Sequence, residues 1–220
     1  MKKIQNINWE ALVNDGENYG DTKGKLSPEE KIIYEAIKDN TVLKIQDSFL
    51  FTQRGPATAE HGEKLAALIA NFEAIKKIKT LILTHNHIGP GGARILTESA
   101  FLPKVTYLHL GSNHLGDEGV KIIAQAAMFS EVKTLNLECN GITAEGAKAL
   151  AQSPVFTKVT SLNMVDNRVG DEGALAIADS DALANLTYLH LGGNRIKSDE
   201  AKKALKESQK LTQLETLKVF

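Results

Sequence analysis

Pairs of apolar residues alternate with polar residues at regular places along the chain. The five clearest pairs are Leu81 and Leu83, Leu108 and Leu110, Leu135 and Leu137, Leu162 and Met164, and Leu189 and Leu191. Alternation with a period of two predicts a short β-strand with one buried face. The sequence therefore predicts a series of short strands of one kind.

An asparagine follows each predicted strand at a fixed distance. These residues are Asn86, Asn113, Asn140, Asn167 and Asn194, and each lies 27 residues after the one before it. Behind each asparagine the apolar residues take helical spacing, as Ala147, Leu150 and Ala151 do. A period of this length predicts a solenoid of strand, turn and helix repeats. Because a helix joins successive strands, we expect parallel strands and right-handed crossovers.

The repeated pattern LxxLxLxxNx(I/L/V)xxxG, followed by a helix, resembles the leucine-rich repeat family, and the repeat length is similar to that of its ribonuclease-inhibitor type. The resemblance covers residues 78 to 220 closely and 41 to 77 more loosely. It implies an α/β solenoid in the form of a horseshoe, with a parallel β-sheet on the concave face and α-helices on the convex face. As a small single module, the chain also resembles bacterial leucine-rich-repeat effector proteins, which implies a protein-binding scaffold.

The segment THNHIGPGG at residues 84 to 92 invites interpretation as a phosphate-binding loop. In the repeat register, however, Asn86 holds the position where the family uses an asparagine ladder, and Gly89 to Gly92 form the turn into a helix. A P-loop would end in Gly-Lys-Ser or Gly-Lys-Thr, whereas Ala93 and Arg94 follow here. We therefore predict a structural turn and no cofactor.

Histidines at the same segment leave a metal site open as an alternative. His85 and His87 are two residues apart, so both could bind one ion only if the loop turned them inward. Further ligands would have to come from His109 and His114 in the next repeat. We predict no metal, and we keep a metal-assisted hydrolase built on His85, His87 and His109 as the rival hypothesis.

The two ends of the chain depart from the repeat. Residues 1 to 26 are polar and glycine-rich, and we predict a capping or partly disordered segment there. Residues 27 to 220 form the predicted leucine-rich repeat domain, which opens with a helical cap over 27 to 40 that starts at Ser27. About six full repeats and a terminal strand over 214 to 220 complete it. The first repeat carries a loop over 51 to 60 of unassigned role.

Composition and charge narrow the class of partner. Lys and Arg total 26 against 27 Asp and Glu, so no overall charge draws the chain to nucleic acid or to an anionic membrane. No apolar stretch has the length of about 20 residues that a membrane span needs. The N-terminus lacks a secretory signal, and Cys139 is the only cysteine. We expect a cytoplasmic protein or, if it is a bacterial effector, one that enters a host cell without a classical signal peptide.

Side chains between the buried leucines are expected to point to the open, concave side of the sheet. Aromatic and amide groups with few lysines favour a protein-binding surface. The alternative is that these short polar residues only keep exposed strands soluble. The predicted central contacts are Tyr107, His109, Asn136, Asn163, Tyr188 and His190.

No arrangement of residues predicts catalysis directly. The acidic pairs Asp117-Glu118 and Asp171-Glu172 fall at predicted helix starts, where negative charge complements the helix dipole. No nucleophile has a neighbouring base that the repeat geometry would fix. We therefore predict a non-enzymatic module that binds a protein partner as a monomer, with a last strand that could pair with another chain. Activation of a GTPase, as in some relatives, stays open beside the metal-assisted alternative.

Overall fold

The computed structural model describes residues 33, 37, 41–46 and 58–220. The predicted segment 1–26, the predicted loop up to residue 57, and the predicted helix 27–40 except Ile33 and Ile37 lie outside these residues. Ile33 and Ile37 are helical and fully buried. Helix α3 begins at Ala59, so the end of the segment predicted as a 51–60 loop is helical.

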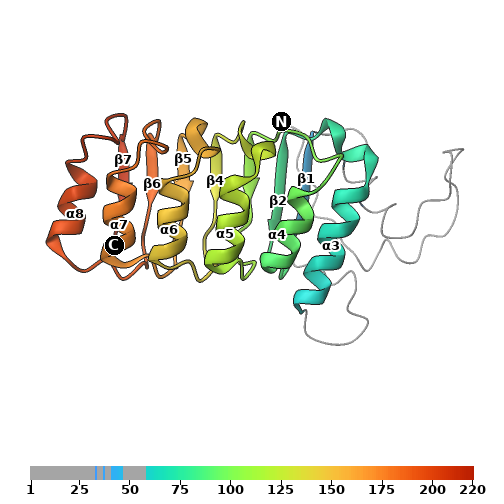
Figure 1. The fold of residues 1–220 in the computed structure, drawn as a ribbon, viewed down its shortest axis with the longest axis horizontal. Helices are drawn as coiled ribbons and strands as arrows, with labels where there is room; N and C mark the ends of the chain where they lie inside the picture. Colours follow the sequence, from blue (N-terminus) through green and yellow to red (C-terminus); the bar gives the residue numbers. More distant parts are fainter. Residues whose placement is uncertain (1–32, 34–36, 38–40, 47–57) are drawn as a thin grey trace, which may run out of the picture.

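The described residues form one sheet of seven parallel strands in chain order. Figure 1 shows these strands side by side along the long axis of the molecule. The strands are β1 (Val42–Gln46), β2 (Thr80–Thr84), β3 (Tyr107–His109), β4 (Thr134–Asn136), β5 (Ser161–Asn163), β6 (Tyr188–His190) and β7 (Thr216–Lys218). The predicted terminal strand is thus shorter than 214 to 220.

The α-helices of the described residues form a layer on one face of this sheet, and none of these described helices lies on the other face (Figure 1). The described α-helices are α3 (Ala59–Asn71), α4 (Gly89–Thr97), α5 (Gly116–Gln125), α6 (Ala144–Ala151), α7 (Gly170–Ala178) and α8 (Asp199–Lys206). Short 3-10 helices η1 (Glu73–Lys77), η2 (Ala127–Phe129) and η3 (Phe156–Lys158) lead back to the next strand. The predicted α/β solenoid of strand, turn and helix is confirmed.

The core lies between the sheet and the helices. Both apolar residues of each predicted pair are buried, as Leu135 and Leu137 of the fourth strand segment illustrate. Small residues such as Ala147 and Gly173 let neighbouring helices approach closely, because a Cβ at Gly173 would lie 3.0 Å from the Cβ of Ala147. No helix in the described part of the chain is long and apolar enough to cross a membrane.

The repeated asparagines bind each repeat to the one before it. The Asn140 side chain is buried, and its oxygen accepts hydrogen bonds from the backbone N–H of Asn113 at 3.1 Å and of Leu115 at 3.2 Å. Its nitrogen donates to the Leu110 carbonyl at 2.9 Å. The side chains of Asn113, Asn167 and Asn194 bridge to the preceding repeat through both oxygen and nitrogen in the same way.

Serines form a second ladder at the other end of the helices, which the sequence pattern did not predict. The Ser153 hydroxyl donates to the Ala124 carbonyl of the preceding repeat at 2.6 Å and accepts from the backbone N–H of Val155 at 3.1 Å. The repeat of Asn113 has Ala126 at this position, which keeps the backbone bond to the Ile123 carbonyl but has no hydroxyl to reach the preceding repeat. The hydroxyls of Ser99, Ser180 and Ser208 donate to the preceding repeat as Ser153 does.

Two first-turn aspartates, one in α5 and one in α7, reach across to the next repeat. Asp117 in α5 accepts hydrogen bonds from the backbone N–H groups of Thr143 at 2.8 Å and Gly146 at 3.0 Å, where α6 begins. Asp171 in α7 accepts from the backbone N–H of Ser198 at 3.0 Å, where α8 begins. The helix-start position predicted for these acids is confirmed. In addition, Asp117 caps the following helix through Gly146, and Asp171 binds the residues just before the following helix.

Replacing Asn140 by alanine should destabilise the fold strongly. Two backbone N–H groups and a carbonyl would be left without their partner in a buried position, and each such group costs about 1–3 kcal/mol. We expect a loss of at least about 3 kcal/mol in the free energy of unfolding, measured by urea denaturation. The exposed Gln125→Ala change is the control and should shift the midpoint little. A shift of equal size in both variants would contradict the role of the ladder.

Asp117→Ala should cost about 1–2 kcal/mol, because it removes a cap of the following helix. Its neighbour Glu118 provides the matched control, since that side chain is 68% exposed and forms a surface ion pair with Arg94 at 3.3 Å. Glu118→Ala is expected to change stability by less than about 1 kcal/mol in the same urea titration. If the two alanine variants melt alike, the cross-repeat cap does not contribute.

Candidate functional site

The face of the sheet without helices carries all six residues predicted as partner contacts. The strand register aligns His109 with Asn136, Asn136 with Asn163, and Asn163 with His190. Tyr107 begins β3 and Tyr188 begins β6, so both occupy the adjacent column. All six side chains are half-buried. They form a continuous polar and aromatic strip across β3 to β6, which we call the strand face.

Three of these residues converge on Glu138, which follows β4. The nitrogen of the Asn163 side chain donates to Glu138 Oε2 at 2.8 Å, and that of Asn136 lies 3.4 Å from the same oxygen. Asn136 Nδ2 also lies 3.1 Å from His109 Nε2. The backbone N–H of Glu138 donates to Asn136 Oδ1 at 3.0 Å, which fixes the orientation of that amide. The centre of the strand face is therefore a connected hydrogen-bond network.

Burial and backbone contacts keep His109 in its neutral form. Its side chain is 16% exposed, and the backbone N–H of Gly111 donates to its Nδ1 at 3.1 Å. Burial lowers the pKa of His109, the Glu138 carboxylate opposes this effect, and Lys44 lowers the pKa further. Because Nδ1 accepts from Gly111, the proton of the neutral imidazole lies on Nε2. The contact of Nε2 with the Asn136 amide nitrogen is then a close approach of two donors and not a hydrogen bond.

Tyr188, His190 and Lys218 form a second cluster toward the C-terminal end of the strand face. The rings of Tyr188 and His190 meet edge to face with centroids 6.3 Å apart. The Lys218 ammonium lies 5.6 Å from the Tyr188 ring centroid, within range of a cation–π contact. Burial, followed by the charge of Lys218, lowers the pKa of His190. The cluster presents a rigid aromatic surface with a cation beside it.

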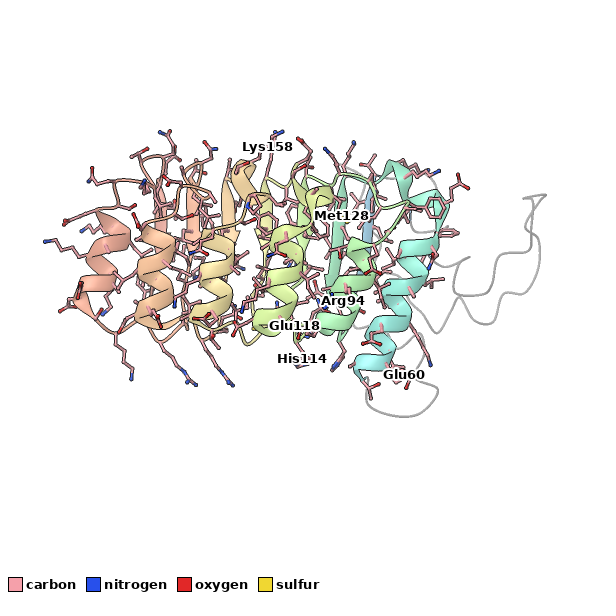
Figure 2. All side chains as sticks on the ribbon, viewed as in Figure 1. Glu60, Arg94, His114, Glu118, Met128 and Lys158 are labelled. Carbon is pink, nitrogen blue, oxygen red and sulfur yellow. The ribbon has the colours of Figure 1, made fainter. Side chains whose placement is uncertain are left out.

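The rim where the strands end contains His87 and His114 of the metal alternative, whereas His109 belongs to the strand face. Figure 2 shows His114 at this rim, on the edge opposite Lys158. The rings of His87 and His114 lie 4.9 Å apart. Among the residues that the structure describes, no three His, Cys, Asp or Glu side chains gather as a metal ion would require. His85, His87 and His109 are thus not brought together as the rival hypothesis expects.

An open hollow of about 590 Å³ lies on the same rim. Its lining includes His114, Cys139, Asp166, Arg168 and Arg195. The chain turns sharply here, and Cys139, Asp166 and Arg195 all have a positive φ of 52 to 60°. The hollow is separate from the Glu138 network, whose residues do not line it.

The sequence interpretation missed Glu138 as a site residue. Its column was visible, because Glu138 occupies the strand-face position of Gly111 and Val165 in the neighbouring repeats. The available signal was charge. Each repeat from β2 to β7 has three positions that face away from the helices, at residues 134, 136 and 138 in the repeat of β4. Among these described positions Glu138 is the only acidic residue. The amides that hold it were predicted, but their common target was not.

A family model described as "Leucine Rich repeat" matches residues 75–95, 101–124, 132–151, 157–178 and 182–199. The chain is a leucine-rich repeat protein. These matches cover the repeats from η1 to the beginning of α8. No curated protein matches this leucine-rich repeat chain.

Three solved structures are similar to this chain at low sequence identity, and only the first has a TM-score that reaches 0.50. The tropomodulin C-terminal domain from Caenorhabditis elegans has a TM-score of 0.50 and 16% identity, and the match covers 66% of this chain and 90% of that one. An internalin from Listeria monocytogenes has a TM-score of 0.44 and 20% identity, over 68% of this chain and 36% of that one. Internalin C2 of that organism has a TM-score of 0.32 and 19% identity, over 86% and 83% of the two chains. This leucine-rich repeat chain spans about a third of the first internalin.

Acidification should weaken the fold through His109. The folded pKa lies below the unfolded value of about 6.5, so the unfolded chain binds more protons below that pH. Stability is therefore full above about pH 6.5 and falls as the pH drops through the folded pKa. Urea midpoints between about pH 7.5 and 5.5 should fall less steeply in His109→Gln than in the unaltered chain. Equal slopes for the two proteins would remove His109 as a contributor.

Proposed function

We propose that this leucine-rich repeat protein is a non-enzymatic scaffold that captures a protein partner on its strand face. The observation that carries the proposal is the strip of six half-buried aromatic, imidazole and amide side chains on the side of the sheet without helices. Such a composition is typical of the central part of protein interfaces, where aromatic residues are enriched and charged residues are depleted.

The whole sheet face, of which the strand face is the central part, has the dimensions of a standard interface. Seven parallel strands at a spacing of about 4.8 Å give a surface about 30 Å across. Interfaces of ordinary size bury about 800 Å² on each partner. One folded domain or an extended segment of a partner could therefore contact the whole face at once.

Two tyrosines are the proposed energetic anchors of this surface. Tyr107 and Tyr188 lie in one column on β3 and β6, on either side of the Glu138 network. Tyrosine is frequent among the few interface residues that dominate binding energy. The hydrogen bonds within the network already fix Asn136 and Asn163, so less side-chain entropy is lost when a partner binds.

We also propose the finer assignments that the repeat pattern suggested. Two features support the ribonuclease-inhibitor type of leucine-rich repeat. Each of the strands β2 to β6 is followed by an α-helix, and the repeat has a period of 27 residues. The role of a bacterial effector inside a host cell rests on the resemblance of the sequence alone. Fusion of the chain to a translocation reporter in a candidate bacterium would test that role, and a reporter retained in the bacterium would contradict it.

Affinity capture from cell lysate tests the strand face directly. The unaltered chain should retain a partner that is lost when Tyr107, His109, Asn136 and Tyr188 are all changed to alanine, because the proposed contacts are removed. Mass spectrometry identifies the partner, and circular dichroism establishes that both proteins are folded.

A second multiple variant provides the matched control for this experiment. Lys121, Gln125, Glu172 and Glu200 are exposed on the helices of the opposite face, and their change to alanine should leave capture intact. A partner kept by the strand-face variant and lost by the helix-face variant would overturn the proposal.

A further inference from the structure

We propose that the partner anchors a basic side chain, arginine or lysine, on the carboxylate of Glu138. This inference rests on the proposed function, because it names the chemistry of the group that the strand face receives. It follows from three properties of Glu138, which are a fixed position, an unpaired charge and an open approach.

The carboxylate is held in place before any partner arrives. Asn163 Nδ2 at 2.8 Å and Asn136 Nδ2 at 3.4 Å both address Oε2, and the Glu138 side chain is 32% exposed. Both amides are themselves fixed, since Asn136 Oδ1 accepts from the backbone of Glu138 and Asn163 Oδ1 accepts from the backbone of Val165. A glutamate side chain oriented in this way presents its second oxygen in one direction.

The charge of Glu138 has no cationic partner among the described residues of the chain. Its nearest titratable neighbour is His109, whose Nε2 lies 3.9 Å from Oε1, too far for a hydrogen bond. Burial lowers the pKa of His109, so the imidazole is neutral near pH 7. The two amides supply dipoles but no positive charge. Glu138 Oε1 is therefore a charged acceptor that can receive a hydrogen bond from a partner.

The absence of a side chain at Gly111 leaves the space that the Glu138 carboxylate occupies. A Cβ at position 111 would lie 2.9 Å from Glu138 Cγ and 3.1 Å from Oε1. Any larger residue would press on the carboxylate from the neighbouring repeat. In the next repeat the same position holds Val165, which has a side chain. The absence of a side chain at Gly111 therefore leaves more space around Oε1 on the side of β3 than on the side of β5.

A protein that covers the strand face would remove water from Glu138. A carboxylate that loses water without gaining a counter-charge is strongly unfavourable, whereas a hydrogen-bonded cation offsets the loss. Arginine suits the site best, because its planar guanidinium can bond a carboxylate and stack on an aromatic ring.

A charge at one end of the sheet extends this recognition pattern. Lys218 on β7 lies three strands away from β4, in the row of Asn136. At a spacing of about 4.8 Å per strand, Lys218 is about 14 Å from Asn136. The complementary surface therefore combines a basic group with an acidic group on the β7 side.

Selection of short random peptides displayed on phage tests the inference without a known partner. The unaltered chain is immobilised, and peptides are eluted, sequenced and synthesised for affinity measurement. We expect enrichment of arginine or lysine at one position, and a loss of affinity of at least about tenfold with Glu138→Gln, which keeps the shape and removes the charge. Glu200→Gln, an exposed acid on α8, is the control and should bind the same peptides unchanged.

The outcomes separate this inference from the function on which it rests. Peptides that are lost with Tyr107→Ala and Tyr188→Ala but show no basic residue, or bind Glu138→Gln normally, would overturn the anchor and leave the strand face as the binding surface. Peptides unaffected by all of these changes, or no selected peptide at all, would overturn both. Thermal melts of each variant establish that a loss of binding is not a loss of fold.

Discussion

The hydrogen bonds from each asparagine to the preceding repeat are the interaction on which this solenoid depends. At the end of each strand the chain must turn, and the residues beside the asparagine take a left-handed conformation, as His85, Ser112 and Cys139 do. That conformation costs roughly 1–2 kcal/mol for a residue with a side chain. The buried amide offsets this cost because it bonds the backbone groups that the turn exposes. It also sets the distance between repeats, and therefore the register of the sheet and the rows of the strand face.

Much of the fold could be predicted because its causes are repeated. The alternation at Leu135 and Leu137, the period of Asn113 and Asn140, and the helical spacing after them each recur in neighbouring repeats. The interactions between repeats were harder to find. Asp117 was placed at the beginning of its own helix, but its oxygens act on Thr143 in the next repeat. A contact across 26 residues depends on how repeats stack, which a pattern within one repeat does not contain.

The candidate site could be predicted only in part, because the repeat pattern fixes which residues face away from the helices but not which of them contact one another. The six predicted residues were found because the strand pattern fixes which positions face away from the helices. Glu138 was not selected, because its significance depends on the convergence of His109, Asn136 and Asn163 on one carboxylate. Each of those residues is unremarkable in its own repeat. The specificity of a regular scaffold thus comes from the irregular residues that neighbouring repeats bring together.

The aspartate contacts at alternate repeat boundaries have a consequence for which repeats can be added or removed. Asp117 ties the helix of the repeat of Asn140 to the repeat of Asn113, and Asp171 does the same two repeats later. At the intervening boundary Ala144 stands where the aspartate would be, and the exposed ion pair of Lys148 with Glu172 spans the two helices instead. Removal of the repeat of Asn140 alone would set Asp117 against the beginning of α7, which no aspartate of the described residues binds now. Removal of that repeat together with the next would set Asp117 against the beginning of α8, where Asp171 binds. We therefore expect the array to tolerate the loss of such a pair of repeats better than the loss of one.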